Sequence, residues 1–397
     1  MEMRFDFASE DYDSYLKAIK KSGLGCSCPV IHIAGSNGKS STANLLSAIY
    51  EASGRKVGLF LNHFVSHPRE MIQINHEIIA LEEYEKIEKN LSKISDKFDL
   101  SSFQRIFMIA LSYFESAKLD LCVIETGLGG SLDATHIHYP KLALCLITSV
   151  SLEHTELLGT TLSQIGNEKC GIFQERVPVL FGPLDDSCKP TMVDLALSLD
   201  CPIHNVDEPH FVQLKEDGFH FDYGGKHDLR LGSFAHYDLS NACLALEAVA
   251  ALENAFPVEE EAIRKGLAIK PLPGHFQRID NILFDCAENP AAMAALMRSL
   301  AIFRAKQVDV IFASSREQNI AVELPLIDNY VHSITLTTFE GSDARVEDDY
   351  FLFAPDYLSS PSYEDAKKTL LEAEPNALLV VTGNMEFVFD CLKKELK

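Results

Sequence analysis

The chain has 397 residues, of which 47% are hydrophobic and 23% charged, so it is long enough for two or three globular domains, and we expect two. A formal net charge of −23 at pH 7 excludes a global electrostatic attraction to nucleic acid or to an anionic membrane. The acidic N-terminus lacks the features of a signal peptide, and no apolar run approaches the roughly 18 residues of a membrane span, so we expect a soluble, cytoplasmic protein.

The ten cysteines are spread along the chain. The closest pair, Cys26 and Cys28, has no second pair at zinc-ligand spacing. All ten are therefore expected to be reduced thiols.

The first strong pattern joins a strand, a glycine-rich loop and a helix. Residues 30–34 are apolar apart from His32, residues 35–39 read Gly-Ser-Asn-Gly-Lys, and apolar residues then recur at helical spacing to Gly54. Such a loop presents backbone N–H groups and the positive end of a helix dipole to an anion. Lys39 would reach the β- and γ-phosphates of a nucleotide, and the hydroxyl of Ser40 or Ser41 a magnesium ion or phosphate oxygen. Because a full Walker motif would have glycine in place of Ile33, a purely structural glycine turn remains the alternative.

The next segments alternate between strand and helix patterns. Strands are expected at 56–61, 121–124 and 142–147, and a helix at 103–117, which indicates parallel βαβ units and an α/β class. Glu125 ends one of these strands, where the carboxyl ends of parallel strands line a ligand crevice, and is a candidate magnesium ligand. The glycines of 127–130 allow a tight turn against a substrate, although a simple loop explains them equally well.

Two further pairs of polar residues follow. Glu153-His154 comes after a strand, and Glu168-Lys169 is in a helical segment. Taken alone, the histidine fits a structural role and the Glu-Lys pair a solvated helix face.

The rest of the chain divides at a linker. Residues 177–232 alternate short extended runs with turns, which indicates a β-rich annex, and helical periodicity returns at 239–254. The cluster Pro271-Leu-Pro-Gly274 marks a boundary, which gives domains at 1–270 and 271–397. Beyond it, strands are expected at 282–285, 308–313, 334–338, 351–353 and 378–382.

In their order along the chain, these motifs resemble the folylpolyglutamate synthase and dihydrofolate synthase family, within the Mur ligase superfamily. The most specific run is Ile124-Glu-Thr-Gly-Leu-Gly-Gly-Ser-Leu-Asp-Ala-Thr135. The other matching runs are His32-Ile-Ala-Gly-Ser-Asn-Gly-Lys39, Val57-Gly-Leu-Phe60, Glu70, Glu153-His-Thr-Glu-Leu-Leu-Gly159, Glu168-Lys-Cys-Gly-Ile172, Asn241-Ala242, Pro273-Gly274, Asp285-Cys-Ala-Glu-Asn-Pro290 and Thr382-Gly383.

The resemblance implies a P-loop NTPase-like N-terminal domain with a parallel sheet and a small β annex, followed by a Rossmann-like α/β C-terminal domain. It also implies a reaction in which ATP phosphorylates the carboxylate of dihydropteroate or a reduced folate. The amine of L-glutamate then displaces phosphate to form an amide. ATP and Mg²⁺ are the implied cofactors, a second monovalent or divalent cation is left open, and a monomer is expected.

The resemblance also assigns roles to individual residues. It implies that Lys39, Lys169 and His154 are catalytic, and that magnesium is held by Glu125 and His154, with Lys169, if carbamylated, as ligand of a second metal. Carbamylation requires a neutral amine and hence a lysine with a lowered pKa. The implied nucleotide-binding residues are Gly35, Ser36, Asn37, Gly38, Lys39, Ser40, Ser41, Asn241, His275 and Asp285.

Four positions depart from the family pattern. Asn62 replaces a serine metal ligand, and its amide oxygen still suits magnesium. His275 stands for an arginine, Glu288 for a histidine, and Gln318 for the lysine of an Asp-Lys-Asp motif. A carboxylate at Glu288 would repel a triphosphate unless it is protonated or bridged by metal. Two explanations stay open: Arg278 or Arg316 supplies the lost charge, or the C-terminal half of ATP recognition has decayed.

Three hypotheses follow. The first is a folate-type glutamate ligase. A cell-wall Mur ligase fits less well, because such enzymes carry an extra domain ahead of the ATPase and only 34 residues precede Gly35. The third is a divergent nucleotide-binding protein with a different acceptor or without ligase activity, which the changes at His275, Glu288 and Gln318 keep open.

Overall fold

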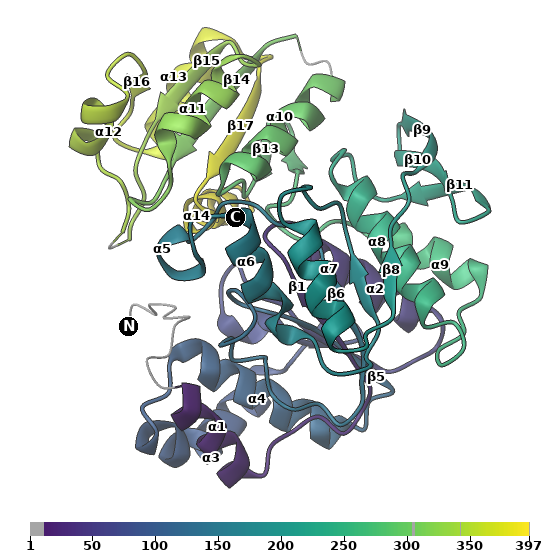
Figure 1. Ribbon diagram of the computed structural model, residues 1–397. Coiled ribbons are helices and arrows are strands. Elements are labelled where there is room, and N and C mark those ends of the chain that lie inside the picture. Colours follow the sequence, from purple (N-terminus) through teal and green to yellow (C-terminus); the bar gives the residue numbers. More distant parts are fainter. Residues whose placement is uncertain (1–11, 304–305, 342, 397) are drawn as a thin grey trace. The chain divides into compact units, whose positions relative to one another are not determined.

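The computed structural model describes residues 12–303, 306–341 and 343–396 (Figure 1). The acidic N-terminal residues considered above lie outside this range. The chain separates into two compact units, one made of Met1–Ser151, Thr155–Leu231 and Ser240–Ile269, the other of Leu152–His154, Gly232–Leu239 and Lys270–Lys397. Among the described residues, none of the helices combines the length and apolar character that crossing a bilayer requires.

An eight-stranded sheet forms the centre of the first unit, in the order β4-β3-β2-β5-β1-β6-β7-β8. The six strands from β2 to β8 in this order are parallel, and β3 and β4 add antiparallel pairs at one edge. The strands are β1 (Val30–Ala34), β2 (Val57–Phe60), β3 (Ile72–Ile74), β4 (Glu77–Ile78), β5 (Leu121–Glu125), β6 (Leu142–Ile147), β7 (Val179–Phe181) and β8 (Ile203–Asn205).

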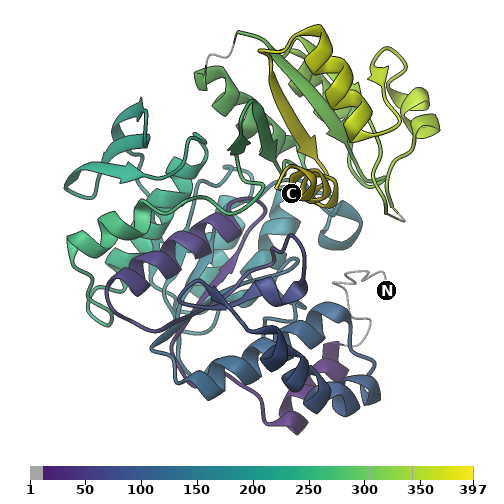
Figure 2. The ribbon, with the colours of Figure 1, turned by 180° about the vertical axis from the view of Figure 1, so that it is seen from behind.

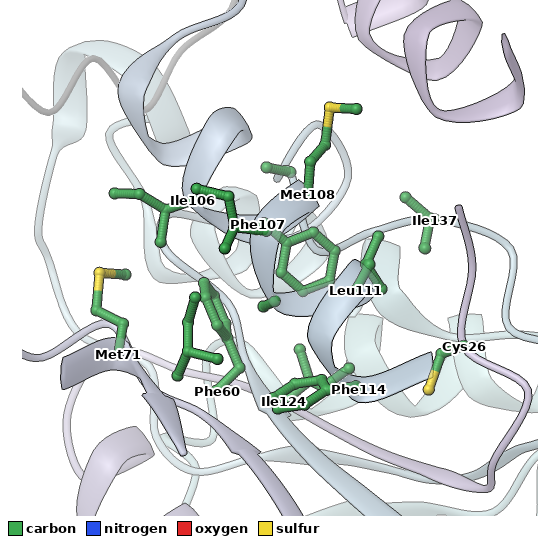
Figure 3. Close-up of a cluster of buried hydrophobic side chains, with 14 of the residues drawn as sticks. Cys26, Phe60, Met71, Ile106, Phe107, Met108, Leu111, Phe114, Ile124 and Ile137 are labelled. Atoms are coloured by element: carbon green, nitrogen blue, oxygen red, sulfur yellow. The ribbon is translucent and has the colours of Figure 1, made fainter. Parts of the chain in front are cut away.

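Helices α1 (Tyr12–Ser22), α3 (Leu81–Lys97) and α4 (Ser102–Ala117) pack on one face of this sheet. Figure 3 shows part of the resulting core, with Phe60 of β2 and Ile124 of β5 against the side chains of α4. The rings of Phe60 and Phe107 meet edge to face at 4.9 Å between centroids. Burying one such side chain stabilises the folded state by about 2–3 kcal/mol. This packing therefore holds in place the sheet from whose strands the phosphate loop and the glycine-rich loop emerge.

Helix α2 (Lys39–Ala52) lies against β1, β2 and β5 and beside α9 (Glu260–Leu267), as Figure 2 shows from behind. Gly266 allows the two helices to approach closely, because a Cβ atom there would lie 2.5 Å from the Cα atom of Ile49. The other helical elements of this unit are η1 (Pro68–Met71), α5 (Thr155–Leu158), α6 (Leu162–Lys169), η2 (Cys170–Ile172) and α7 (Lys189–Ser198). Helix α8 (Asp238–Ala251) contributes residues to both units.

The β annex is smaller than the sequence suggested. Strands β7 and β8, with α7 between them, extend the parallel sheet, so the interpretation of residues 177–209 as annex was wrong. Both strands have only three residues, and α7 buries only Met192 and Ala196. The sequence therefore shows neither the alternation typical of a strand nor the 3.6-residue repeat typical of a helix. The annex itself is an antiparallel sheet of β9 (His210–Lys215), β10 (Gly218–Tyr223) and β11 (Lys226–Leu231).

The second unit has a six-stranded sheet in the order β12-β13-β17-β14-β15-β16, parallel except for β12. Its strands are β12 (Gln277–Ile279), β13 (Ile282–Asp285), β14 (Val308–Ala313), β15 (Ser333–Leu336), β16 (Leu358–Ser359) and β17 (Leu378–Gly383). Its helices are α10 (Pro290–Phe303), α11 (Ile320–Asp328), α12 (Glu347–Phe353), α13 (Tyr363–Ala373) and α14 (Met385–Glu395). The predicted fold class, a parallel sheet with a β annex followed by a Rossmann-like sheet, is confirmed.

One predicted strand of this unit was wrong, because residues 351–353 end helix α12. Phe351 and Leu352 are 72% and 74% exposed. An apolar run that is not buried lacks the cover that a parallel strand needs on both faces.

Candidate active site

The predicted phosphate loop connects β1 to α2. At Gly35 a Cβ atom would lie 1.9 Å from Thr148 Oγ1, so the loop backbone packs directly on the segment that follows β6. Thr148 Oγ1 donates a hydrogen bond of 2.7 Å to Asn37 O, and Asn37 N donates to Ser149 Oγ at 2.9 Å. Ser151 N donates to Ser36 Oγ at 3.0 Å. The residues that follow β6 thus hold the phosphate loop in place.

The start of α2 is suited to an anion. Gly38 is the N-cap residue, with φ of 83°, and it provides no side-chain cap for the first N–H groups of the helix. Such uncapped N–H groups and the helix dipole attract a phosphate. Lys39 Nζ donates to the carbonyl oxygens of Gly35 and Ser36, at 2.9 and 3.0 Å, so its charge lies over the same loop. Ser41 follows on the first turn and is partly exposed.

Glu125 lies at the carboxyl end of β5 and is 2% exposed. Its two carboxylate oxygens accept hydrogen bonds from Ser40 Oγ at 2.8 Å and from Asn62 N at 3.0 Å. Burial raises the pKa of this carboxyl group, while the charge of Lys39 and the two hydrogen bonds oppose the rise. The carboxylate of Glu125 and the hydroxyl of Ser40 are oxygen donors of the kind that Mg²⁺ prefers, so these two residues fit the implied metal.

The side chain of Asn62 points toward the glycine-rich loop after β5. Its Nδ2 atom donates to Gly127 O at 3.4 Å. Asn62 thus contacts Glu125 through its backbone N–H and the glycine-rich loop through its side chain.

Asp133 organises the glycine-rich loop, a role that the sequence reasoning missed. Its Oδ2 atom accepts from the N–H groups of Gly127 and Leu128, both at 2.9 Å, and its Oδ1 atom accepts from the backbone and hydroxyl of Thr135. Thr135 Oγ1 in turn contacts His32 Nε2 at 2.8 Å. An aspartate that follows a Gly-rich turn was the available signal, since its carboxylate readily binds nearby backbone N–H groups.

Lys169 is 1% exposed at the C-terminal end of α6. A Cβ atom at Gly130 would lie 2.6 Å from Lys169 O, and Ser131 N donates to Glu168 O at 3.1 Å, so the glycine-rich loop packs on this helix end. The interpretation of the pair as a solvated helix face is wrong for Lys169. Lysine side chains are seldom fully buried, so the burial of Lys169 calls for a specific role.

Asn241, on α8, lies against the phosphate loop. A Cβ atom at Gly38 would be 2.2 Å from its Oδ1 atom, and Asn241 is 9% exposed. His154 is exposed, has a left-handed φ of 42°, and is grouped with the second unit. Within the first unit the structure therefore brings together Lys39, Glu125 and Asn241, whereas His154 belongs to the second unit.

Asp285 and His275 belong to the second unit. Asp285 ends β13, is 5% exposed, and its Oδ2 atom accepts from Tyr237 Oη at 2.6 Å and Phe276 N at 3.0 Å. Burial raises the pKa of Asp285 to about 7. Burial also lowers the pKa of His275, partly offset by the charge of Asp238.

The unusual Glu288 has a defined place in the second unit. Its Oε1 atom accepts a hydrogen bond of 2.6 Å from Met385 N, the first residue of α14. Its backbone oxygen accepts from Gln318 Nε2 at 3.2 Å, and Gln318 Oε1 accepts from Ser315 N at 2.9 Å. The carboxylate thus lies at the positive end of a helix dipole, which stabilises its charge.

The two arginines considered as replacements have local partners. Arg316 pairs with Asp349 at 3.2 Å. Arg278 Nε donates to Asp280 O at 2.6 Å.

Comparison with known proteins places these features in one family. The Mur ligase middle domain model matches residues 33–249. The chain is 30% identical over 342 residues to dihydrofolate synthase/folylpolyglutamate synthase of Haemophilus influenzae, across 79% of this chain and 75% of that one. It is 26% identical over 374 residues to folylpolyglutamate synthase of Lacticaseibacillus casei, across 89% and 87%.

A solved structure is similar over nearly the whole chain. The bifunctional folylpolyglutamate synthase/dihydrofolate synthase with Mn, AMPPNP and L-glutamate bound superposes with a TM-score of 0.85 at 26% identity, covering 99% of this chain and 96% of that one. The resemblance noted in the motifs is confirmed. The chain belongs to the folylpolyglutamate synthase and dihydrofolate synthase family of Mur-type ligases.

Proposed function

We propose that this chain is an ATP-dependent ligase that joins L-glutamate to the carboxylate of dihydropteroate or of a reduced folate, with release of ADP and phosphate. The observation that carries the proposal is the grouping of Lys39, Ser40 and Glu125 at the uncapped N-terminus of α2. A related protein of 26% identity is known with a nucleotide analogue, manganese and L-glutamate bound, which supports the same ligand classes here.

In the proposed reaction a carboxylate oxygen of the acceptor attacks the γ-phosphorus of ATP, and ADP leaves. The amine of glutamate then attacks the acyl carbon, phosphate leaves, and the amine loses a proton. The attacking and accepting groups are both anionic, so fixed positive charge is required where they meet. Lys39 and the N–H groups of the phosphate loop supply that charge.

A divalent ion at Glu125, with Asn62 and His154 as further proposed ligands, would neutralise phosphate charge when bound. The burial of Glu125 supports this role, because a buried carboxylate is costly without a cation. Asn241, beside Gly38, is proposed to contact the nucleotide, as are Ser36, Asn37 and Ser41. Lys169 is proposed to be carbamylated and to hold a second cation, which its burial beside Gly130 supports.

We further propose that residues 1–270 form the ATP-binding domain, and that residues 271–397 contact ATP through Asp285 and His275. Glu288 need not oppose this, since its carboxylate is bound to the N-terminus of α14. The ten free cysteines support a cytoplasmic location, and a monomer is proposed.

The test is to incubate the pure protein with Mg-ATP and L-glutamate plus either dihydropteroate or tetrahydrofolate, and to measure phosphate release and product mass. One acceptor should gain a single glutamate, and Lys39→Ala should abolish turnover, whereas Lys86→Ala, an exposed lysine of α3, should not change it. Tight ATP binding with no product from either acceptor would instead favour a nucleotide-binding protein without ligase activity.

A further inference from the structure

Three thiols meet at the start of β1. Cys26 and Cys28 lie in the segment just before this strand, and Cys122 lies in β5. The Sγ atom of Cys28 is 3.3 Å from the Sγ atoms of both Cys26 and Cys122. All three Sγ atoms lie within 4.8 Å of one another. The three cysteines therefore form one cluster, although Cys122 is 94 positions from Cys28.

The backbone holds this arrangement. Cys122 N donates to Pro29 O at 2.8 Å, and Val30 pairs with Cys122 in the parallel ladder. On the other side of β5, Gly58 of β2 pairs with Cys122, and a Cβ atom there would lie 2.8 Å from its Sγ atom. Glycine at this position leaves room for the sulfur.

The cluster lies at the edge of the apolar core. Cys122 is 0% and Cys26 3% exposed, and Cys28 is partly exposed. Figure 3 shows Cys26 among the side chains of that core. Cys26 and Cys122 are thus shielded from bulk solvent, and Cys28 is shielded in part.

Other buried thiols of this unit behave differently. Cys145, Cys188 and Cys201 each donate to a backbone carbonyl oxygen, at 3.3 Å, as small buried thiols commonly do. In the Cys26–Cys28–Cys122 cluster, Cys26 Sγ also donates to Cys28 O at 3.9 Å, but Cys28 Sγ lies 3.3 Å from the two other sulfurs, a contact that the other three thiols lack. Thiolates in such a group would repel one another without a cation between them.

We propose that Cys26, Cys28 and Cys122 bind one thiophilic metal ion with a filled d shell, Zn²⁺ or Cu⁺. Three soft sulfur ligands suit these ions rather than magnesium, and binding releases the thiol protons to solvent. With metal–sulfur bonds of about 2.3 Å, sulfurs of a tetrahedral site lie roughly 3.7 Å apart, so the present 3.3 Å contacts need to open by only a few tenths of an ångström. Cu⁺ is satisfied by three thiolates, whereas Zn²⁺ would take solvent as a fourth ligand beside Cys28.

The position of the cluster indicates a structural role. It lies at the amino ends of β1 and β5, while the phosphate loop and Glu125 lie at their carboxyl ends. Glu125 follows Cys122 by three positions of the same strand, which separates their Cα atoms by about 10 Å. A bound ion would clamp the two strands that carry the phosphate loop and Glu125 without contacting substrates.

The experiment adds Zn²⁺ or Cu⁺ to the reduced full-length protein under anaerobic conditions, removes loosely held metal with a chelator on gel filtration, and measures metal per chain by mass spectrometry. One ion per chain should remain, and its identity distinguishes Zn²⁺ from Cu⁺. The stoichiometry should fall to near zero in Cys28→Ser. It should stay at one in the matched control Cys201→Ser, whose thiol donates to the backbone oxygens of Gln174 and Leu199 and contacts no other sulfur that the structure describes.

A second measurement uses the unaltered chain, so that it does not depend on a variant folding. Alkylation of Cys28, followed by peptide mass spectrometry, should be slowed at least tenfold by the metal and restored by a strong chelator. Equal alkylation with and without metal, retention of the ion in Cys28→Ser, or no stoichiometric metal would each overturn the proposal and leave three packed thiols.

Discussion

Ser40 Oγ donates a hydrogen bond of 2.8 Å to Glu125 Oε1, which joins the first turn of α2 to the end of β5 across 85 positions of sequence. The contact couples the phosphate loop to a buried carboxylate beside it. A hydroxyl that orients a metal-binding carboxylate influences both metal affinity and turnover. The pair is therefore the most direct point at which to test the proposed chemistry.

Ser40→Ala should lower turnover and weaken activation by Mg²⁺, each by about 10–100-fold, because Glu125 loses its orienting hydroxyl. The measurement is kcat as a function of Mg²⁺ at saturating ATP. Ser47→Ala is the matched control, since Ser47 is buried on the same helix and its hydroxyl has no hydrogen-bond partner among the described residues. Equal effects of the two substitutions would mean that Ser40 acts only through packing.

Gly38→Ala should weaken ATP binding by roughly tenfold or more, because overpacking of this kind costs about 1–3 kcal/mol. The new Cβ atom would lie 2.2 Å from Asn241 Oδ1 and displace that side chain from the phosphate loop. Gly54→Ala is the control, because Gly54 has a similar φ of 87° with nothing within 4 Å of its Cβ position. Direct titration with ATP compares them, and equal affinities would contradict a role for the Gly38–Asn241 contact.

The sequence predicted the elements that have strong local patterns. The strand-loop-helix around Lys39 and the placement of Glu125 at the end of β5 follow from short-range signals, and both are found in the structure. The sequence-based prediction missed β7 and β8, which are too short to show a periodic pattern. It also assigned a strand to residues 351–353, which lie in a helix.

The sequence also did not predict contacts between residues far apart along the chain. Nothing in the local sequence indicates that Cys122 joins Cys26 and Cys28, or that Glu288 binds the N-terminus of α14. Tyr237 likewise reaches Asp285 across 48 positions. Such partners depend on strand order, which the spacing of residues along the chain does not determine.

Lys169 should carry a carbamate in the active protein. Lys169→Ala should then lower turnover at least about 100-fold, and protein equilibrated with carbon-13 labelled CO₂ should show a carbamate signal in its carbon NMR spectrum. Lys189→Ala, a lysine at the start of α7 that is exposed, is the control and should keep both activity and signal. An unlabelled but fully active protein would rule out the modification.

Glu288→Gln should destabilise the protein by about 1 kcal/mol, because a neutral amide can still accept from Met385 N but loses the interaction of a negative charge with the helix dipole. Urea unfolding followed by circular dichroism measures the change, and Glu372→Gln, an exposed residue of α13, should leave the midpoint unaltered. An increase in stability on Glu288→Gln would show that the carboxylate is strained rather than stabilised at this site.

The raised pKa of Asp285 should make the free energy of unfolding depend on pH. Burial raises its pKa to about 7, so the folded chain binds this proton more tightly than the unfolded chain, in which an aspartate has a pKa of about 4. The stabilisation from protonation is fully present below pH about 4 and is lost as the pH rises through about 7. Asp285→Asn imitates the protonated group and keeps an oxygen that accepts from Tyr237 Oη and Phe276 N.

The free energy of unfolding of Asp285→Asn should therefore equal that of the parent at pH 4. At pH 8 it should be higher by on the order of 2–4 kcal/mol, since each pKa unit corresponds to about 1.4 kcal/mol. Urea unfolding followed by circular dichroism suits the chain, which has no tryptophan for fluorescence. Asp280→Asn, an exposed turn residue, should follow the parent at every pH. Parallel curves for Asp285→Asn and the parent would show that Asp285 is ionised throughout and that its hydrogen bond from Tyr237 outweighs burial.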